Sequence, residues 1–528
     1  MQVRLALVGI VLATSGAQAD DASVTKTSTT PTPDSLDLRL TLSSFLYRQT
    51  GEDAPPFVSM GQAPQNASPV HRFFGDLRME LSDEGLAVDA RVRQTTSARY
   101  QSGADGGGEY ELRTLSYRLG SPHTHVTFGR QYIDAVGATK VDGLAFSQAI
   151  AGDAVSATVF GGTFPQLGSR SVDTDYTHVR NADGTEGGVL LPVVGGLGVT
   201  YQTPAIHGDI GIAGVYVPQD VPNAPAEEKT RVFAASSGYW RPASTVDIYH
   251  FALVDVAGGN GANLTNGSLG VDARPVTNVQ LTVAVNHVST DLLQIAARNA
   301  LTDPDPTAIG VVQNNIALLR ISQDMARGAA SVALSARRFE LSLAAGLHRR
   351  PGVSVALPDG SGAVTFPEAK SADTTFTILD RRSVAGTRIA LSGTITEPIG
   401  SATTWSRAEV VRASVSKMFA EQRGQVEVDA MGEHVQDANA QACTGSLNPL
   451  ACYGTSSTNA AQAGTLVSWR VAREWLLIAD AHVGYQKIGS HYLVPMTADP
   501  ASPLVDMPVA WPTVLSVTGF VRLSWRYR

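Results

Sequence analysis

Charged side chains alternate with apolar ones in several segments near the start of the chain. Within these segments charged and hydroxyl residues take every second position, and mostly Leu, Val, Met or Ala fill the positions between them. The charged set comprises Asp37, Arg39, Asp76, Arg78, Glu80, Asp89, Arg91 and Arg93, and Glu111 and Arg113 extend it. Carboxylates and guanidinium groups on one wet face can form ion pairs and set up an electric field across water. Bracing ion pairs within a wall are an equally good interpretation of any single pair.

Catalytic and metal-binding residues do not form a recognisable pattern. A nucleophile needs a base within hydrogen-bond reach, and the sequence contains no G-x-S-x-G, H-E-x-x-H or G-K-S/T motif. His123 and His125 flank Thr124 at a predicted turn. A metal pair is one interpretation and a solvated turn is the one we favour, because a metal site needs further ligands. We therefore expect no enzyme, no metal and no cofactor.

The elements that carry these residues are β-strands. Alternation of apolar and polar residues recurs from residue 36 to the end of the chain, and we expect roughly 18–22 strands. Short turns such as 82–85 alternate with long polar segments rich in Gly, Asn, Asp and Pro, such as 164–187 and 289–312. One short helix is predicted over 290–301, inside a long loop.

Alternation alone fits two architectures, a soluble β-sandwich with an apolar interior or a membrane β-barrel with an apolar exterior. Strand lengths suited to a tilted bilayer crossing and the alternation of short turns with long loops favour the barrel. The apolar set is also rich in Ala and Gly, which would fill a large soluble core poorly. The predicted fold class is all-β, an antiparallel up-and-down transmembrane β-barrel with an even number of strands.

The ends of the chain indicate export. Residues 1–19 have a basic start, an apolar run and Ala17-Gln18-Ala19, which is the pattern of a cleaved secretory signal peptide. We expect 20–34 to be a short polar periplasmic tail and 35–528 to form one barrel. Cys443 and Cys452 are the only cysteines, and in an oxidising compartment a disulfide between them is the expected state. The net charge of −8 is weak for this length and says nothing about nucleic acid; we expect no nucleic-acid partner.

Aromatic residues concentrate near the expected strand ends, which predicts girdles at the two membrane interfaces. They include Tyr47, Phe73, Phe74, Tyr110, Tyr117, Tyr132, Tyr201, Tyr216, Trp240, Trp405, Trp469, Trp475, Tyr485, Trp525 and Tyr527. In the final strand, Phe520 and Val514 are the two apolar residues within the polar set.

With its signal peptide, alternating strands and terminal Trp525 and Tyr527, the chain resembles the porin-type outer-membrane β-barrels of Gram-negative bacteria. The segment 128–146, with Gly129-Arg130-Gln131 and Val141-Asp142-Gly143, is similar to stretches of large porin-like barrels, some linked to secreted polysaccharide. In that family the last strand usually ends on an aromatic residue read by the insertion machinery, whereas here Arg528 follows Tyr527.

The resemblance implies an outer-membrane channel with a water-filled pore for hydrophilic solutes, because a barrel of this size leaves a bore rather than a packed core. The charged set would then line the pore, and loops 164–187 or 289–312 would narrow it. An export barrel for a polysaccharide and a closed surface anchor or adhesin are the alternatives. The expected partners are outer-membrane lipid and lipopolysaccharide, the barrel-insertion machinery, two further copies in a homo-trimer by analogy, and export proteins under the second hypothesis.

Overall fold

The computed structural model describes most of the chain from residue 36 to 527. The segments outside this description are 51–69, 98–107, 166–171, 173–174, 177, 181–185, 221–228, 259–261, 290–321, 335–337, 357–362, 367, 382–383, 385, 401–403, 440–451, 496–503 and 511–512. The predicted signal peptide 1–19, the tail 20–34 and the helix 290–301 therefore lie outside the described residues. Within the described residues, no helix is long and apolar enough to cross a membrane.

Nearly all described residues belong to strands of one antiparallel sheet. The strands in its first half are β1 (Asp37–Thr50), β2 (Val70–Asp83), β3 (Leu86–Ser97), β4 (Gly108–Gly120), β5 (Thr124–Ile133), β6 (Thr139–Ala149), β7 (Val155–Thr163), β10 (Val193–Gln202), β11 (Ile206–Tyr216), β12 (Thr230–Ala243), β13 (Val246–Gly258) and β14 (Asn263–Val276). Its second half contains β15 (Val279–Ser289), β16 (Ser322–Leu334), β17 (Phe339–Arg350), β20 (Ala369–Asp380), β21 (Thr387–Pro398), β22 (Thr404–Phe419), β23 (Gly424–Asn439), β24 (Cys452–Arg470), β25 (Trp475–Pro495), β26 (Leu504–Ala510) and β27 (Val514–Tyr527).

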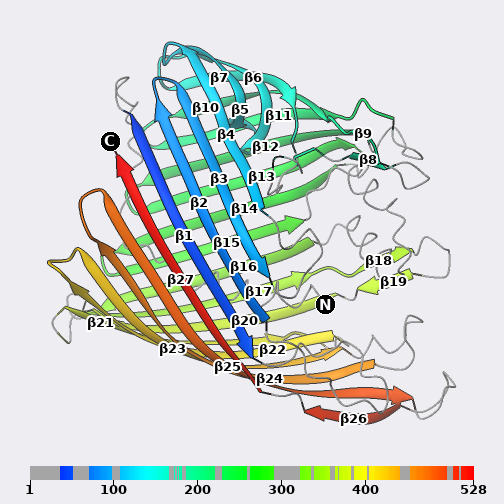
Figure 1. The fold of residues 1–528 in the computed structure, drawn as a ribbon, viewed down its shortest axis with the longest axis vertical. Helices are drawn as coiled ribbons and strands as arrows, with labels where there is room; N and C mark the ends of the chain where they lie inside the picture. The colour runs from blue at the N-terminus through cyan, green and yellow to red at the C-terminus, as the bar shows by residue number, and fades with distance from the viewer. Residues whose placement is uncertain are drawn as a thin grey trace.

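The sheet closes on itself. The first strand β1 pairs with the last strand β27 from Leu38 opposite Tyr527 to Thr50 opposite Leu515, as the blue and red strands of Figure 1 show. Of the 23 strands, β26 pairs with the far part of β25, which leaves a closed barrel of 22 strands. The prediction of an even-numbered antiparallel barrel is confirmed, at the upper end of the expected range.

The two ends of the barrel differ. Tight connections such as 84–85, 244–245 and 277–278 lie at one end, where the C-terminus also lies (Figure 1). Two small hairpins lie at the other end, β8 (His178–Arg180) with β9 (Glu186–Val189) and β18 (Val353–Ala356) with β19 (Ala363–Phe366). In an outer-membrane barrel the short turns face the periplasm.

Apolar side chains cover the outside of the wall. Leu42 on β1, Leu77 on β2 and Val92 on β3 are 56%, 48% and 47% exposed. Leu77 and Val92 lie between residues of the charged set, and Leu42 lies between two hydroxyl residues. Because a strand turns successive side chains to opposite faces, the charged residues on these strands point inward. An apolar outer face of this extent, which no other part of the described protein covers, requires lipid around it.

Aromatic rings gather on the outer face at the short-turn end. Trp525 lies 6.3 Å from both Trp475 and Tyr527, measured between ring centroids, and Phe419 lies 6.4 Å from Trp469. This is the arrangement expected of an interfacial girdle. The assignment of Phe74 to a girdle is wrong: Phe73 is the residue exposed on the outer face, and the side chain of Phe74 points into the barrel.

Candidate functional site in the barrel lumen

A lattice of ion pairs covers the inner face of five adjacent strands. We call these inward-facing charged residues of β27, β1, β2, β3 and β4 the charged wall. Arg78 contacts Asp89 with both Nε and Nη2, at 2.9 and 2.8 Å, and Arg526 binds Asp37 in the same two-pronged way at 2.9 and 2.5 Å. Such paired contacts hold a guanidinium in a fixed orientation.

Further ion pairs link the remaining members of the charged wall. They join Arg39 to Glu80 (3.6 Å), Arg78 to Glu80 (2.7 Å), Arg91 to Asp76 and to Glu111 (3.4 Å), Arg93 to Asp76 (3.1 Å) and to Glu109 (3.7 Å), and Arg113 to Asp89 (3.8 Å) and to Glu111 (3.6 Å). Positive and negative groups thus alternate across the wall.

Part of the charged wall is accessible to water although it faces inward, whereas Asp76 is buried. The side chains of Arg39, Arg113 and Glu80 are 49%, 39% and 34% exposed. An inward-facing group can be this exposed only where the barrel interior holds space for solvent. Exposed pairs contribute about 0–1 kcal/mol each to folding, so the exposed pairs of the wall add little to the stability of the barrel.

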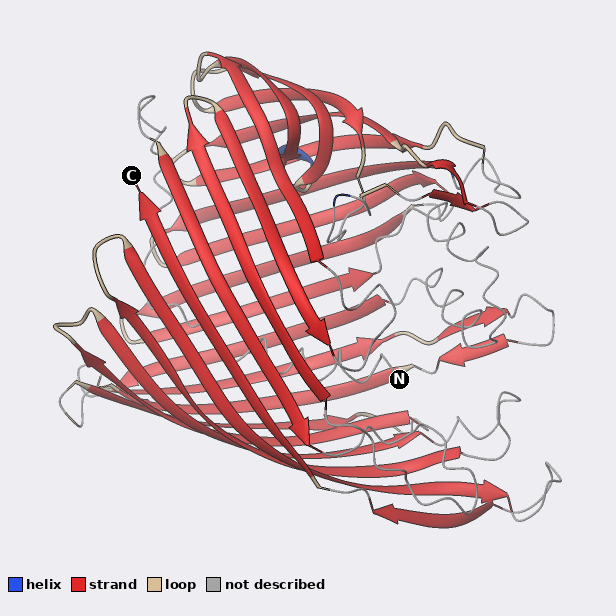
Figure 2. Cartoon of the chain, in the orientation of Figure 1, coloured by secondary structure: helices blue, strands red, loops and turns tan. Residues whose placement is uncertain are grey.

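A hairpin next to the charged wall leaves the barrel and enters the lumen. The pairing of β4 with β5 stops at Leu115 opposite Arg130, and that of β6 with β7 stops at Asp142 opposite Thr163. The strands β5 and β6 continue to pair with each other as far as Ile133 opposite Thr139. Their tip carries the 3-10 helix η1 (Asp134–Val136), which contacts β10, β11 and β12. Figure 2 shows η1 in blue, enclosed by the ring of strands.

Glycines make room for the hairpin. Gly129, with φ of +107°, stands where β5 bends away from β4, a backbone conformation that residues with a Cβ rarely adopt. Gly198 on β10 and Gly211 on β11 lie beneath η1, and a Cβ at either position would overlap Ala135. The hairpin therefore rests directly on the backbone of the opposite strands.

Apolar side chains seal this contact. We call the buried group around η1 the lumenal core, and its members are Ile133, Val136, Val141, Ala145, Phe160, Phe164, Val194, Ala213, Val215, Phe233 and Ala235. Val136 and Val141 are fully buried. Burying a side chain of this size stabilises the folded state by about 1.5–3 kcal/mol, so the hairpin is anchored and the lumen is narrowed at this sector.

Buried polar residues join the hairpin to the connection that follows β7. We call this cluster the latch; it consists of Arg130, Lys140, Asp142, Asp175 and Tyr176. Arg130 on β5 holds Asp142 on β6 at 2.6 and 2.5 Å and also donates to Asp175, and Lys140 Nζ lies 3.2 Å from the same Asp175. Arg130 and Asp175 have side chains only 8% and 4% exposed. Buried charges of this kind require partners.

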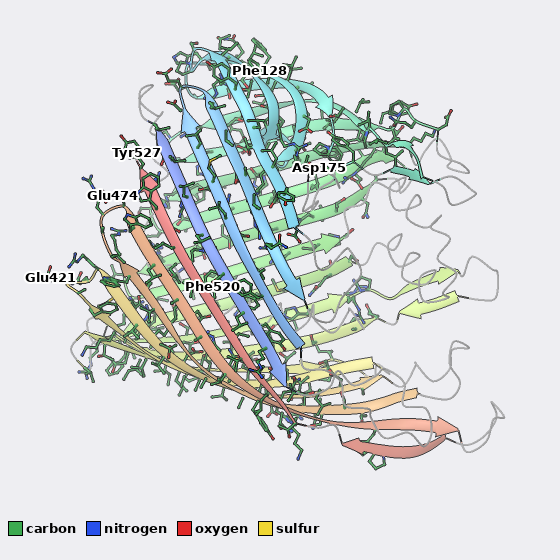
Figure 3. All side chains as sticks on the ribbon, viewed as in Figure 1. Phe128, Asp175, Glu421, Glu474, Phe520 and Tyr527 are labelled. Carbon is green, nitrogen blue, oxygen red and sulfur yellow. The ribbon has the colours of Figure 1, made fainter. Side chains whose placement is uncertain are left out.

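The phenol of Tyr176 completes the latch. Its Oη donates to Asp142 Oδ2 at 2.8 Å and lies 2.7 Å from Thr163 Oγ1. Burial, together with the neighbouring Asp142 carboxylate, raises the pKa of Tyr176 to about 12. The phenol therefore remains a donor throughout the neutral and mildly alkaline range. Part of segment 164–187 is thus tied to a hairpin inside the barrel, as Asp175 in Figure 3 illustrates.

The structure places the predicted charged residues together and adds others. Asp37, Arg39, Asp76, Arg78, Glu80, Asp89, Arg91, Arg93, Glu111 and Arg113 all belong to the charged wall; that they line a conducting pore remains a prediction. Sequence reasoning missed the latch. Arg130 and Asp142 stand in segment 128–146, but alternation alone gives no sign that this hairpin turns inward.

The remaining predicted sites have few described contacts. His123 Nδ1 lies 3.2 Å from Asp153 Oδ1 on an exposed turn, and the described residues contain no group of three or more His, Cys, Asp or Glu that could hold a metal. Cys443 lies outside the described residues, and Cys452 begins β24, so their disulfide stays a prediction. A groove lined by Leu269, Val285 and Leu347 lies on the lipid-facing side of the wall.

Comparison with known proteins gives a likeness of fold. No family model and no curated protein matches the sequence. Among solved structures, the chain is similar to a bacterial polysaccharide outer membrane secretin (10% identity, 72% of this chain, 100% of that chain, TM-score 0.30). It is also similar to OccK9 (OpdG) of Pseudomonas aeruginosa (9%, 93%, 98%, 0.34) and to the P pilus usher PapC translocation pore (10%, 93%, 99%, 0.37). The chain itself is a closed antiparallel β-barrel with apolar groups outside and charges inside, which is the arrangement of barrels that cross an outer membrane.

Proposed function

We propose that the chain forms a water-filled channel through which hydrophilic solutes cross the outer membrane. The observation that carries the proposal is the solvent exposure of the inward-facing charged wall, where Arg39 reaches 49%. An apolar solute can enter lipid without losing favourable hydration. A polar solute would lose its hydration in lipid and therefore needs a water-filled path. Alternating guanidinium and carboxylate groups offer that path hydrogen bonds of both kinds.

Planar-bilayer conductance combined with liposome swelling tests the proposal. Purified protein should give discrete conductance steps at neutral pH, and liposomes should swell in small sugars at rates that fall as the sugar becomes larger. Absence of both conductance and swelling would remove the open-channel function and leave the fold untouched. Swelling that does not depend on sugar size would indicate leaky liposomes, which protein-free liposomes control for.

A second candidate function is export of a polysaccharide, and the inward hairpin is the feature that favours it. An exporter needs a barrier while idle, and η1 with the lumenal core and the latch obstructs part of the bore. Under this hypothesis the wild-type barrel should conduct weakly until a partner protein or a latch variant frees the hairpin. Under the channel hypothesis it should conduct at once.

The surroundings of the barrel follow from the same proposal. We expect outer-membrane lipid and lipopolysaccharide against the apolar face, the barrel-insertion machinery acting on the last strand, and a homo-trimer by analogy with other porins. Mass measurement of the detergent-solubilised protein would separate a trimer from a single barrel.

A further inference from the structure

Three phenylalanines lie side by side on the lumenal face, midway along their strands. Phe45 of β1 stands opposite Phe520 of β27 on one side and opposite Phe74 of β2 on the other. We call these three residues the phenylalanine row; Phe520 is labelled in Figure 3. The rings of Phe45 and Phe74 are stacked, with centroids 5.0 Å apart and planes 22° from parallel.

The phenylalanine row is not part of a packed core. Phe160 and Phe233, in the lumenal core, are 5% and 4% exposed because the hairpin covers them. The three rings of the row are only half-buried, so part of each ring remains open toward the lumen. Apolar ring area left open in a water-lined space is unfavourable, so a solute that covers it is stabilised there.

A guanidinium stands over each end of the row. Arg93 Cζ lies 4.6 Å from the ring centroid of Phe74, and Arg522 Cζ lies 5.1 Å from that of Phe520. Arg93 is also paired with Asp76 at 3.1 Å. Arg522 forms no ion pair within the described part of the chain, and it is exposed. Of the two guanidinium groups over the row, that of Arg522 is therefore the one available to an anion.

We propose that the phenylalanine row and Arg522 form a subsite for acidic sugars, which deepens the proposed channel function and rests on it. One face of a pyranose ring presents polarised C–H groups that stack on an aromatic face, while the hydroxyl edge stays in water. With the ring on Phe520 and Phe45, a carboxylate on the sugar reaches the guanidinium of Arg522. The row crosses three neighbouring strands, so apolar ring area continues beside the contact with Phe520.

The test uses three solutes that separate ring from charge. Glucuronate has both, glucose has the ring without the charge, and gluconate has the charge on an open chain. In single-channel recordings we expect glucuronate to interrupt the current more often than either control solute, by about two- to fivefold for each missing feature. Calorimetric titration of the detergent-solubilised protein with the same three solutes measures binding without requiring conductance.

Three variants assign the effect. Phe520→Leu keeps apolar volume but removes the aromatic face, and should abolish the preference of glucuronate over gluconate while sparing that over glucose. Arg522→Gln should do the reverse. Phe73→Leu, on the lipid-facing side next to the row, is the matched control and should change neither preference.

The outcomes distinguish the subsite from the channel. Conductance with equal responses to all three solutes, or loss of preference in Phe73→Leu alone, would overturn the subsite and leave the channel standing. A barrel that does not conduct but binds glucuronate in an Arg522-dependent manner would overturn the channel and retain the subsite. Ring preference that survives Phe520→Leu together with Phe45→Leu would also overturn it.

Discussion

Two sectors of the same barrel use their inward-facing side chains in opposite ways. On the charged wall, Arg39 and Arg113 are 49% and 39% exposed and share their carboxylates across strands. In the latch, Arg130 is 8% exposed and is held by Asp142 and Asp175. The chemistry is the same in both places, guanidinium against carboxylate, but one sector meets water and the other is covered by a hairpin.

The difference shows that the burial of an ion pair, rather than its presence, decides its role. An exposed pair is screened by water and exchanges partners at little cost, which suits a surface that solutes pass. A buried pair cannot lose one partner without leaving an uncompensated charge in a dry site. The exposed pairs of the charged wall can therefore exchange partners, whereas the latch holds the hairpin in place.

Removing one guanidinium from each sector should give the largest contrast. Arg130→Met leaves Asp142 and Asp175 buried without their main partner, and we expect a loss of about 3–5 kcal/mol in the free energy of unfolding. Arg39→Met on the charged wall, where the guanidinium is 49% exposed and lies 3.6 Å from Glu80, should cost about 0–1 kcal/mol. Unfolding each variant with guanidinium chloride in detergent micelles, followed by tryptophan fluorescence, measures both losses in the free energy of unfolding. Equal losses would remove the distinction between the sectors.

A larger side chain at the site where η1 packs on β11 should change the conductance of the lumen more than the strand content of the barrel. Gly211→Val places a branched side chain where the Ala135 carbonyl and Val136 now lie, so η1 cannot dock. We expect larger single-channel conductance with the strand content intact by circular dichroism. Gly432→Val, on β23 where a Cβ would have open space, is the control. Unchanged conductance in Gly211→Val would show that the hairpin does not narrow the path.

The smallest effect concerns pH. The folded pKa of Tyr176, raised to about 12 from 10.0, means that its contribution is fully present below about pH 10 and declines as the pH rises through 12. Conductance should be steady from neutral pH to about 10 and then rise as the latch weakens. Tyr176→Phe, which lacks the two hydrogen bonds, should lose about 1 kcal/mol and show less of this alkaline change. Identical profiles in both proteins would exclude Tyr176 from the latch.

Much of the fold could be predicted from the sequence because alternation is a local property. The spacing of Asp76, Arg78 and Glu80 alone predicts that they share one face of a strand. The same alternation predicts the apolar face of the terminal strand. The inward turn of the hairpin could not be predicted, since it depends on contacts between Ala135 and strands far along the chain.

Aromatic residues show the same limit. Phe73 and Phe74 are neighbours in sequence, and composition near a strand end suggested a girdle for both. The strand register places Phe74 on the lumenal face, opposite Phe45 of β1. Phe45 in turn lies opposite Phe520 of β27, which completes the phenylalanine row. In the sequence, the apolar residue Phe520 stands out among polar neighbours of its face. That it belongs to an aromatic row could be recognised only from Phe45 and Phe74 on the adjacent strands.

The most direct test of the account is thiol accessibility at two adjacent residues of β27. In a Cys443→Ser, Cys452→Ser background, Thr518→Cys places a thiol on the lumenal face and Val517→Cys places one on the outer face, where Val517 is 43% exposed. A charged, membrane-impermeant thiol reagent reacts with the thiolate, which forms in water and not in lipid. In intact membranes we expect Thr518→Cys to be labelled and Val517→Cys to be protected. Labelling of Val517→Cys with protection of Thr518→Cys would contradict the assignment of lumen and lipid on which everything above depends.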